Sequence, residues 1–453
     1  MVMIGLEIHG YISTNEKLFC RCKTSHGIKL SKPNTNISPV CTSQPGSKPL
    51  LPNEKALDKA IQIALVLNCK INEKLIWQRK HYDWPDLPKG FQSTLSGSHA
   101  NPVGIKGEFL GIRIREAHLE EDPAAWDPKT GTVDYNRSGS PLIEIVTEPD
   151  FSSSEQVVDW LKQLIVALGY IKALDKEAGI KADVNISLPE LKGERVEVKN
   201  VNSLRNIKTT IESEIIRQKE DVPKVQETRR FDEAKGVTMK MRSKEQAQDY
   251  RFISEPDLPV MIISKSKIEQ IKKQLPETPQ EKLQKLIKKY NIDKKYAEIL
   301  TKKIELAEFF EKVIEKINPK LASPWVCVEL LRALNYSKKE LEDVNLEPSH
   351  FIELLKLVED KKITELKAKE ILNKFIPNSF SPLKEAEANS KISNKSELED
   401  ACKEIIKENP TPVKDYQNGK QEAMNFLIGK VMQKTNKRAD FKTTREVLEK
   451  LLK

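Results

Sequence analysis

The stretch IRIREAHLEEDPAAWDPKTGTVDYNRSGSPLIEIVTEPD, residues 112–150, decides the fold because it holds two strand patterns around a polar connection. In the first pattern, every second residue from Ile112 to Glu120 falls on one side of an extended chain. A strand would therefore place Glu116, His118 and Glu120 on one face. This density of ionisable groups on one strand face points to a binding site.

The second pattern closes the stretch. Leu142, Glu144, Val146 and Glu148 alternate among β-branched residues, which favour strands, and Pro141 limits the strand at its start. Two acid-bearing strands joined by a turn would bring carboxylates to one spot, as hard cations such as Mg²⁺ require. An exposed sheet face with solvated acids is the alternative that the spacing leaves open.

The N-terminal residues MVMIGLEIHGYIS also predict a strand. Ile4, Leu6 and Ile8 would face one way, and Glu7 and His9 would face the other. Glu7 and His9 could both approach one metal or phosphate, although a polar pair at a sheet edge explains the spacing equally well.

Three of the six cysteines lie near the N-terminus, at Cys20, Cys22 and Cys41. Thiolates in turns can hold Zn²⁺ tetrahedrally, but Ser38 stands where a Cys-x-x-Cys pair would begin, and nothing in the spacing demands His26 as a substitute. An intact zinc site is therefore not expected from the spacing. The scattered cysteines argue against a disulfide scaffold and for a reduced, cytosolic protein.

Length and charge limit the classes of protein further. At 453 residues the chain predicts two or three domains, and it contains neither a transmembrane run nor a signal peptide. Nearly all of the net charge of +9 lies in residues 261–453, mostly as lysine. Basic helical regions often follow phosphate backbones, but a solvated lysine-rich surface is at least as common.

In the rest of the chain, the residue composition changes near residue 260. Before it, the patterns predict a helix over 151–170 that Gly169 ends, strands over 181–190 and 194–204, and a further helix over 209–219. After it, proline-punctuated Lys/Glu/Leu/Ile helices predominate. The sequence contains no P-loop, dinucleotide-binding glycine pattern or nucleophile elbow, so acids with metals, and arginines, would have to bind any phosphates.

At this point the order of motifs carries a specific resemblance. The motifs are IGLEIH (4–9), FCRC (19–22), PDLPKGFQ (85–92), HLEED (118–122), VDYNRSGSPLIEIVTEPD (133–150), VEVKNVNS (196–203), QETRRFDEAKG (226–236), RSKEQAQDYRFISEPDLP (242–259) and NFLIGKVMQKTNKRAD (425–440). Together they resemble the B subunits of the heterotrimeric tRNA-dependent amidotransferases that act on Asp-tRNA(Asn) and Glu-tRNA(Gln). The resemblance covers essentially the whole chain.

The resemblance implies an α+β fold. An antiparallel-sheet cradle related to glutamine synthetase would occupy residues 1–260, a helical domain 261–340 and a helical tRNA-binding tail 341–453. It implies a ligase that phosphorylates the side-chain carboxylate of a misacylated tRNA with ATP and Mg²⁺. Ammonia from the amidase (A) subunit would then displace phosphate, and a small C subunit would complete the heterotrimer. The resemblance implies a cytoplasmic enzyme without a membrane partner.

The site residues follow from the motif positions. Those matched to the catalytic metal site are Glu7, His9, Glu120 and Glu144, with Glu121 and Glu148 as alternative ligands. Lys80 and Lys89 match polar residues near the ammonia channel, and Arg137 and Arg242 are matched as phosphate clamps on weaker grounds, a structural ion pair being the alternative for each arginine.

Two departures and two rival functions remain open. Ser38 replaces a family cysteine, which leaves zinc undecided, and Asn436 stands where the family tail usually has glycine. One rival is a non-catalytic tRNA-binding or assembly scaffold, which would predict degenerate acid positions. The other is a free-standing ligase for a small acid, against which the basic helical tail argues.

Overall fold

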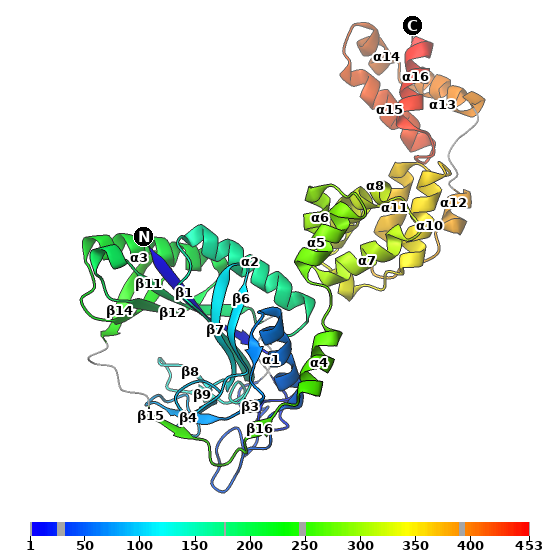
Figure 1. The fold of residues 1–453 in the computed structure, drawn as a ribbon. Coiled ribbons are helices and arrows are strands. Elements are labelled where there is room, and N and C mark those ends of the chain that lie inside the picture. The colour runs from blue at the N-terminus through cyan, green and yellow to red at the C-terminus, as the bar shows by residue number, and fades with distance from the viewer. Residues whose placement is uncertain (1, 25–31, 176–177, 244–250, 389–394, 453) are drawn as a thin grey trace. The chain divides into compact units, whose positions relative to one another are not determined.

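The computed structural model describes residues 2–24, 32–175, 178–243, 251–388 and 395–452 (Figure 1). The chain divides into two compact units, residues 1–278 and residues 279–453. Within the described residues, the first unit combines a large sheet with helices, and the second unit is helical. The α+β class predicted from the sequence is therefore confirmed.

Twelve of the described strands form one sheet in the first unit. Its central path runs β14-β13-β12-β11-β1-β10-β7-β5-β4-β15; β6 pairs with β7, and β2 pairs with β6. Every pairing is antiparallel except β12 with β13. The strands are β1 (Met3–Tyr11), β2 (Lys70–Ile71), β4 (Gln78–His81), β5 (Gln92–Thr94), β6 (Gly104–Phe109), β7 (Ile112–Glu121), β10 (Pro141–Thr147), β11 (Ile180–Ser187), β12 (Val196–Asn202), β13 (Glu227–Asp232), β14 (Val237–Ser243) and β15 (Arg251–Ser254).

Two short pairs lie outside this sheet. β3 (Lys74–Leu75) pairs with β16 (Met261–Ile262), and β8 (Ala125–Trp126) pairs with β9 (Val133–Asp134). The β8–β9 pair lies within the polar connection of the 112–150 stretch, between β7 and β10. That connection therefore has a hairpin of its own.

Helices cover the apolar face of the sheet. α2 (Ser154–Tyr170) and α3 (Leu204–Glu220) lie side by side, and α1 (Glu54–Val66) packs against β6 and β7 (Figure 1). Asn53 and Ser153 cap α1 and α2 by accepting from backbone N–H groups of the first turn. The predicted helix over 151–170 is thus confirmed, although Gly169 lies inside it and the helix ends at Tyr170.

The core under these helices explains which way the strands face. Ile4, Leu6 and Ile8 of β1 are buried in it, so Glu7 and His9 lie on the opposite face, as the alternation predicted. The strands predicted over 181–190 and 194–204 are β11 and β12, which contribute valines and an isoleucine to the same core. One face of the sheet is therefore apolar and the other carries the ionisable groups.

The alternation predicted for β7 is wrong in one respect. Ile112 and Ile114 lie in the core together with Ala117 and Leu119, so they do not share the face of Glu116. The register between β7 and β10 shifts at Val146/Thr147, which leaves one extra residue in β7. Such a bulge reverses the facing of every residue beyond it.

Among its described residues, the second unit has two separate apolar cores, one formed by residues between 286 and 386 and one by residues between 398 and 452. The helices of the first core are α5 (Pro279–Lys288), α6 (Lys294–Leu300), α7 (Ile304–Ile314), α8 (Pro319–Pro324), a π-helix (Trp325–Leu330), α9 (Leu331–Tyr336), α10 (Pro348–Glu359), α11 (Glu365–Lys374) and α12 (Leu383–Ala388). Those of the second are α13 (Lys395–Glu408), α14 (Pro410–Gln417), α15 (Glu422–Lys434) and α16 (Phe441–Leu452).

These limits differ from the domain ranges predicted from the sequence. The first unit extends past residue 260 because α4 (Lys265–Gln274) packs on α1 and buries Ile271 in the sheet core. The helical core that begins near residue 286 continues past residue 340 because Phe351 of α10 is buried in it. The change to lysine-rich composition near residue 260 therefore precedes the change of core.

Candidate active site

Three ionisable side chains form a row across β7, β10 and β1. In the strand registers, His118 lies opposite Glu144, and Glu144 lies opposite His9. Glu144 Oε2 is 3.4 Å from His118 Nε2 and 3.2 Å from His9 Nε2. One carboxylate oxygen is therefore held between two imidazole rings.

Glu120 joins this row from the next position along β7 on the same face. Ligand atoms of His9, Glu120 and Glu144 all lie within 4.8 Å of one another, close enough to surround a single cation. Three of the four residues predicted as the metal site are thus together, and we name His9, Glu120 and Glu144 the first acid group. Carboxylate oxygens are the ligands that Mg²⁺ prefers.

The fourth predicted residue, Glu7, belongs to a second acid group with Asp183 of β11 and Glu197 of β12, whose ligand atoms also lie within 4.8 Å of one another. Lys199 Nζ is 2.9 Å from Asp183 Oδ2 and 2.6 Å from Glu197 Oε1. Asn185 donates to Glu7 Oε1 at 3.0 Å. The two acid groups lie on the same face because Glu7 and His9 are two residues apart on β1.

Sequence reasoning missed Asp183 and Glu197 as site residues. Their strands were predicted, but strand alternation alone does not say which strands are neighbours. β11 pairs with β1 and places Glu7 opposite Asp183, and β12 follows β11. The signal that would have found them is that pairing.

Burial and repulsion set the ionisation of both groups. Burial, with the neighbouring charges of Glu144, Glu197 and Asp183, raises the pKa of Glu7. Burial and the charge of Glu144 also raise the pKa of Glu120. Burial opposes ionisation of Glu144 too, but the two histidines outweigh it and hold the pKa of Glu144 well below its usual range.

The histidines show the complementary effect. Burial disfavours the charged ring of His9, but Glu144 more than offsets this and raises the pKa of His9 to about 9. The same balance raises the pKa of His118 to about 10. Without a metal, these carboxylates are therefore compensated by protonated imidazoles, and a divalent cation would supply the same positive charge.

The two alternative ligands lie elsewhere. Glu121 follows Glu120 directly in β7, so its side chain points to the opposite face of the sheet. There it pairs with Lys89 and accepts a hydrogen bond from the Ser93 N–H. Glu148 follows the end of β10 and forms two hydrogen bonds of 3.0 Å with Arg115. Neither carboxylate contributes to the two acid groups.

The two lysines predicted near an ammonia channel differ in their surroundings. Lys80 of β4 lies near Glu120, and its charge favours ionisation of that carboxylate. Lys89 contacts Ser93 Oγ at 3.0 Å and lies over the Phe91 ring at 4.8 Å. A pocket lined by Lys89, Glu121, Phe19, Cys20 and Cys41, among others, adjoins it.

Arg137 is engaged with its own surroundings. Its guanidinium lies 2.9 Å from Asp122 Oδ2 and donates to the carbonyl oxygens of Pro123 and Ala124. These contacts hold the segment after β7 in place. Such a structural ion pair is the alternative that the sequence left open beside a phosphate clamp. Arg242 lies on β14 opposite Thr228, and its side chain is outside the described residues.

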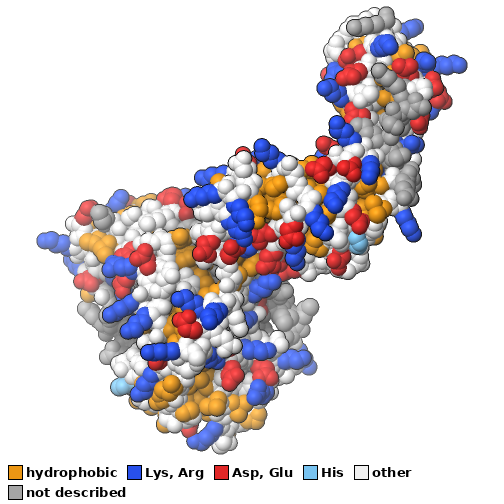
Figure 2. Space-filling model, turned by 45° about the vertical axis from the view of Figure 1, so that its right-hand side comes forward, with side chains coloured by type: hydrophobic (Ala, Val, Ile, Leu, Met, Phe, Trp, Pro, Cys, Tyr) orange, Lys and Arg blue, Asp and Glu red, His pale blue; other side chains and the backbone are white. Residues whose placement is uncertain are grey.

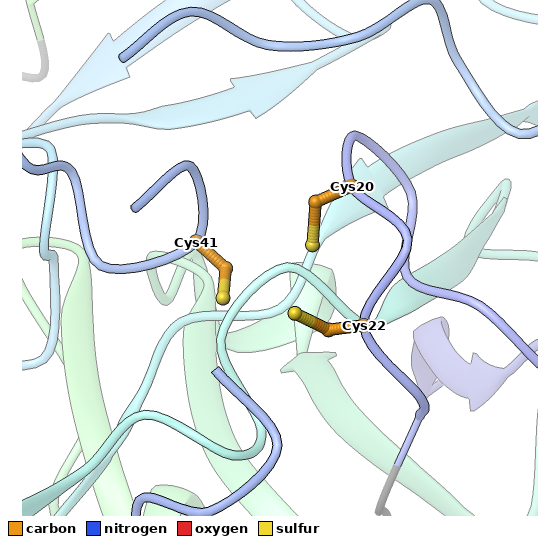
Figure 3. A group of neighbouring side chains, drawn as sticks. All are labelled: Cys20, Cys22 and Cys41. Carbon is orange, nitrogen blue, oxygen red and sulfur yellow. The ribbon is translucent and has the colours of Figure 1, made fainter. Parts of the chain in front are cut away.

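The three cysteines predicted as possible zinc ligands converge (Figure 3). The Sγ atoms of Cys20, Cys22 and Cys41 lie within 4.8 Å of one another. Ser38 Oγ is 3.6 Å from Cys41 Sγ, so a serine hydroxyl lies beside this thiol. The other candidate, His26, lies outside the described residues.

In the part of the chain that the structure describes, no helix has the length and apolarity needed to cross a membrane.

Two family models match the sequence: the GatB/GatE catalytic domain over residues 2–269 and the GatB domain over residues 308–452.

Full-length relatives agree with these matches. Proteins named as the B subunit of aspartyl/glutamyl-tRNA(Asn/Gln) amidotransferase are similar over nearly the whole chain. The protein of Methanocaldococcus jannaschii is 44% identical, over 99% of this chain and 97% of its own length. That of Methanothermobacter thermautotrophicus is 43% identical, over 98% of this chain and 99% of its own. That of Methanosphaera stadtmanae is 43% identical, over 100% and 99%.

Proposed function

The chain belongs to the GatB family of aspartyl/glutamyl-tRNA(Asn/Gln) amidotransferase B subunits, and we propose that the polar face of its sheet is the catalytic centre. The protein is a ligase that takes part in tRNA-dependent amidation, which converts Glu-tRNA(Gln), Asp-tRNA(Asn) or both to the amide form. The finer features of the proposal are a glutamine synthetase-like cradle in the first unit and a tRNA-binding tail in the second.

The proposed reaction has two steps. An oxygen of the side-chain carboxylate attacks the γ-phosphorus of ATP, so that an acyl phosphate and ADP form. Ammonia then attacks the acyl carbon, phosphate leaves with the bonding electrons, and the amide loses a proton. A free carboxylate is a poor electrophile at neutral pH, whereas phosphate is a good leaving group, and neither step needs a protein nucleophile.

The observation that carries this proposal is the presence of two acid groups side by side on one sheet face. Their donor sets fit Mg²⁺: Glu120 and Glu144 with His9 in the first, and Glu7 with Asp183 in the second. Glu197 completes the second group. Bound Mg²⁺ would neutralise the charge that builds up on the transferred phosphoryl group.

The chain's own residues keep this face organised. Lys199 holds Asp183 and Glu197 at one position, and Asn185 fixes Glu7. Lys80 places a positive charge near Glu120, where negatively charged substrate groups would otherwise be repelled. Together these contacts orient carboxylates before substrate arrives, which is the part of catalysis that positioning supplies.

Family membership also supports a proposal for the partners and the remaining sites. The amidase (A) subunit would release ammonia from glutamine, the small C subunit would complete the complex, and the reaction would take place in the cytoplasm. We place the mouth of the ammonia path at the pocket beside Lys89 and Glu121, because the predicted channel residue Lys89 lines it together with its ion-pair partner. A bound zinc ion would need the three thiolates as ligands, with Ser38 or a water molecule as the fourth.

The experiment uses the chain assembled with its two partner subunits, Glu-tRNA(Gln), ATP, Mg²⁺ and ammonium as donor. We expect Glu120→Gln to lower the rate of Gln-tRNA formation about 100-fold or more, because it removes a charged ligand from the proposed Mg²⁺ site. Glu148→Gln is the matched control and should stay within a few-fold of the parent, because Glu148 pairs with Arg115.

Two results would reject the catalytic centre. One is equal activity of the Glu120→Gln protein and the parent. The other is a parent protein that binds the charged tRNA yet consumes no ATP, which would favour the assembly-scaffold function.

A further inference from the structure

The proposed site contains a buried side chain to which neither acid group assigns a role. His118 lies in β7 among three carboxylates, and only 2% of its side chain is exposed. Nε2 is 3.4 Å from Glu144 Oε2 and 4.0 Å from Glu120 Oε2, whereas Nδ1 is 3.1 Å from Glu116 Oε1. Each ring nitrogen therefore faces a carboxylate.

The far side of the ring faces a second carboxylate, that of Glu116. Glu116 also accepts from Ser96 Oγ, and Ser96 follows β5. Ser96, Glu116, His118 and Glu144 thus form a continuous line of polar contacts that ends at His9. The imidazole lies between these two carboxylates: Nε2 faces Glu144 Oε2 at 3.4 Å, and Nδ1 faces Glu116 Oε1 at 3.1 Å without the geometry of a hydrogen bond.

We propose that His118 is a positioning residue that aims the Glu144 carboxylate at the cation bound by His9, Glu120 and Glu144. This inference rests on the proposed function. His118 takes up one lone-pair direction of Glu144 Oε2 through Nε2 and leaves the remaining directions of the carboxylate to the cation. A ligating carboxylate that is held from behind loses less freedom when the metal binds, and such outer contacts are worth about 10–100-fold in metal affinity.

The competing explanation is packing alone. A buried imidazole also fills space between strands, and its loss would disturb the sheet without any specific effect on the cation. The two explanations differ in what they predict for isosteric variants. A packing role depends on size, whereas a positioning role depends on which nitrogen of the ring is reproduced.

The variants His118→Gln and His118→Asn separate these roles. A glutamine amide nitrogen falls near the place of Nε2 and keeps a donor toward Glu144. An asparagine amide nitrogen falls near the place of Nδ1 and keeps only the contact with Glu116. The experiment measures Mn²⁺ binding to the purified full-length chain by electron paramagnetic resonance, together with the melting temperature of each variant.

We expect His118→Gln to bind Mn²⁺ within about 3-fold of the parent protein, and His118→Asn to bind it about 10–100-fold more weakly. Glu116→Gln retains the volume of its parent but removes the negative charge that faces His118 Nδ1, and it should lower the affinity several-fold. Because Glu116 is only partly buried, this variant serves if both His118 substitutions prevent folding.

Four outcomes overturn the proposal. Equal Mn²⁺ affinity in the glutamine and asparagine variants, or affinities that simply follow the melting temperatures, would leave His118 with a packing role. If all variants fold and only Glu144→Gln loses Mn²⁺ binding, the metal site is retained and the positioning role of His118 is rejected. If the parent chain binds no Mn²⁺, the metal site of the proposed function falls as well.

Discussion

At the scale of single residues, a buried lysine lies beside a thiol. Lys17 is 1% exposed, and its ammonium donates to Cys41 Sγ at 3.4 Å and to the Tyr135 carbonyl at 3.1 Å. A buried ammonium needs a compensating charge, and a thiolate supplies one. The hydrogen bond from Cys20, aided by the Ser38 N–H and by Lys17, lowers the pKa of Cys41.

We therefore expect the metal-free chain to hold a thiolate at pH 7, visible by its absorbance at 240 nm. Ordinary thiols lose this signal below about pH 8.5, whereas a lowered pKa keeps it as the pH falls further. Lys17→Met removes one of the groups that lower the pKa of Cys41, so the titration should move toward higher pH.

Cys69→Ser is the control for this titration. Burial raises the pKa of Cys69 to about 12, so Cys69 contributes no thiolate at pH 7 and its replacement should leave the signal unchanged. Because the folded-state pKa of Cys41 is lowered, its ionisation stabilises the folded chain at higher pH. The Cys41 contribution to the free energy of unfolding is present above the thiol's unfolded pKa and declines as the pH falls toward the folded value. A parent protein without thiolate absorbance at pH 7 would contradict this ionisation.

The sequence predicted single residues well where strand alternation was regular and poorly where contacts between distant segments decide. Glu7 and His9 were placed correctly because β1 alternates without interruption. The partners of Arg137 and Glu148 were not predictable, since both depend on which segment follows a strand end. The roles assigned to these residues remain predictions.

At the scale of elements, β6 comes unusually close to the turn after α1. A Cβ at Gly107 would lie 2.5 Å from the Leu67 carbonyl oxygen and 2.5 Å from Cys69 Sγ. Glu108 also donates its N–H to that carbonyl at 2.9 Å. Glycine at residue 107 therefore lets the strand and the helix end come together.

We expect Gly107→Ala to lower the free energy of unfolding by about 1–3 kcal/mol, because overpacking forces the strand away from α1. Gly169→Ala is the matched control: a Cβ there meets no atom within 4 Å and the residue lies inside α2, so the same change should be neutral or stabilise by up to about 1 kcal/mol. Urea unfolding of the two variants gives the comparison. Equal destabilisation by both would contradict the close-approach explanation.

Helices and strands were easier to predict than the irregularities in strand pairing. The helix over 151–170 and the strands around residues 180–202 follow from periodicity and capping, which are local. The bulge in β7 is not local, because it arises where β10 shifts its register against β7. Alternation read through Arg115 therefore placed Ile112 and Ile114 on the wrong face.

At the scale of the whole molecule, chemistry and charge fall in different parts of the chain. Both acid groups lie in residues 1–278, whereas nearly all of the net charge of +9 lies beyond residue 260. Figure 2 shows Lys and Arg interspersed with Asp and Glu on the face in view. A tRNA contact made by the second unit would therefore use selected lysines among acids, and its affinity would fall as salt increases.

The two-unit division makes a last prediction, because it places α4 with the catalytic unit. Ile271 of α4 is 4% exposed and Ile263 is 3% exposed in the sheet core, and Lys267 pairs with Asp58 of α1 at 2.6 Å. Each buried isoleucine contributes roughly 1.5–3 kcal/mol. A chain ending at residue 278 should therefore unfold cooperatively and bind Mn²⁺ as tightly as the full-length chain. A chain ending at residue 260 should lose about 3 kcal/mol or more. Urea unfolding followed by circular dichroism measures the difference. Equal stability of the two truncated chains would place the boundary at residue 260, as the composition alone suggests, and would make α4 a linker instead of part of the catalytic unit.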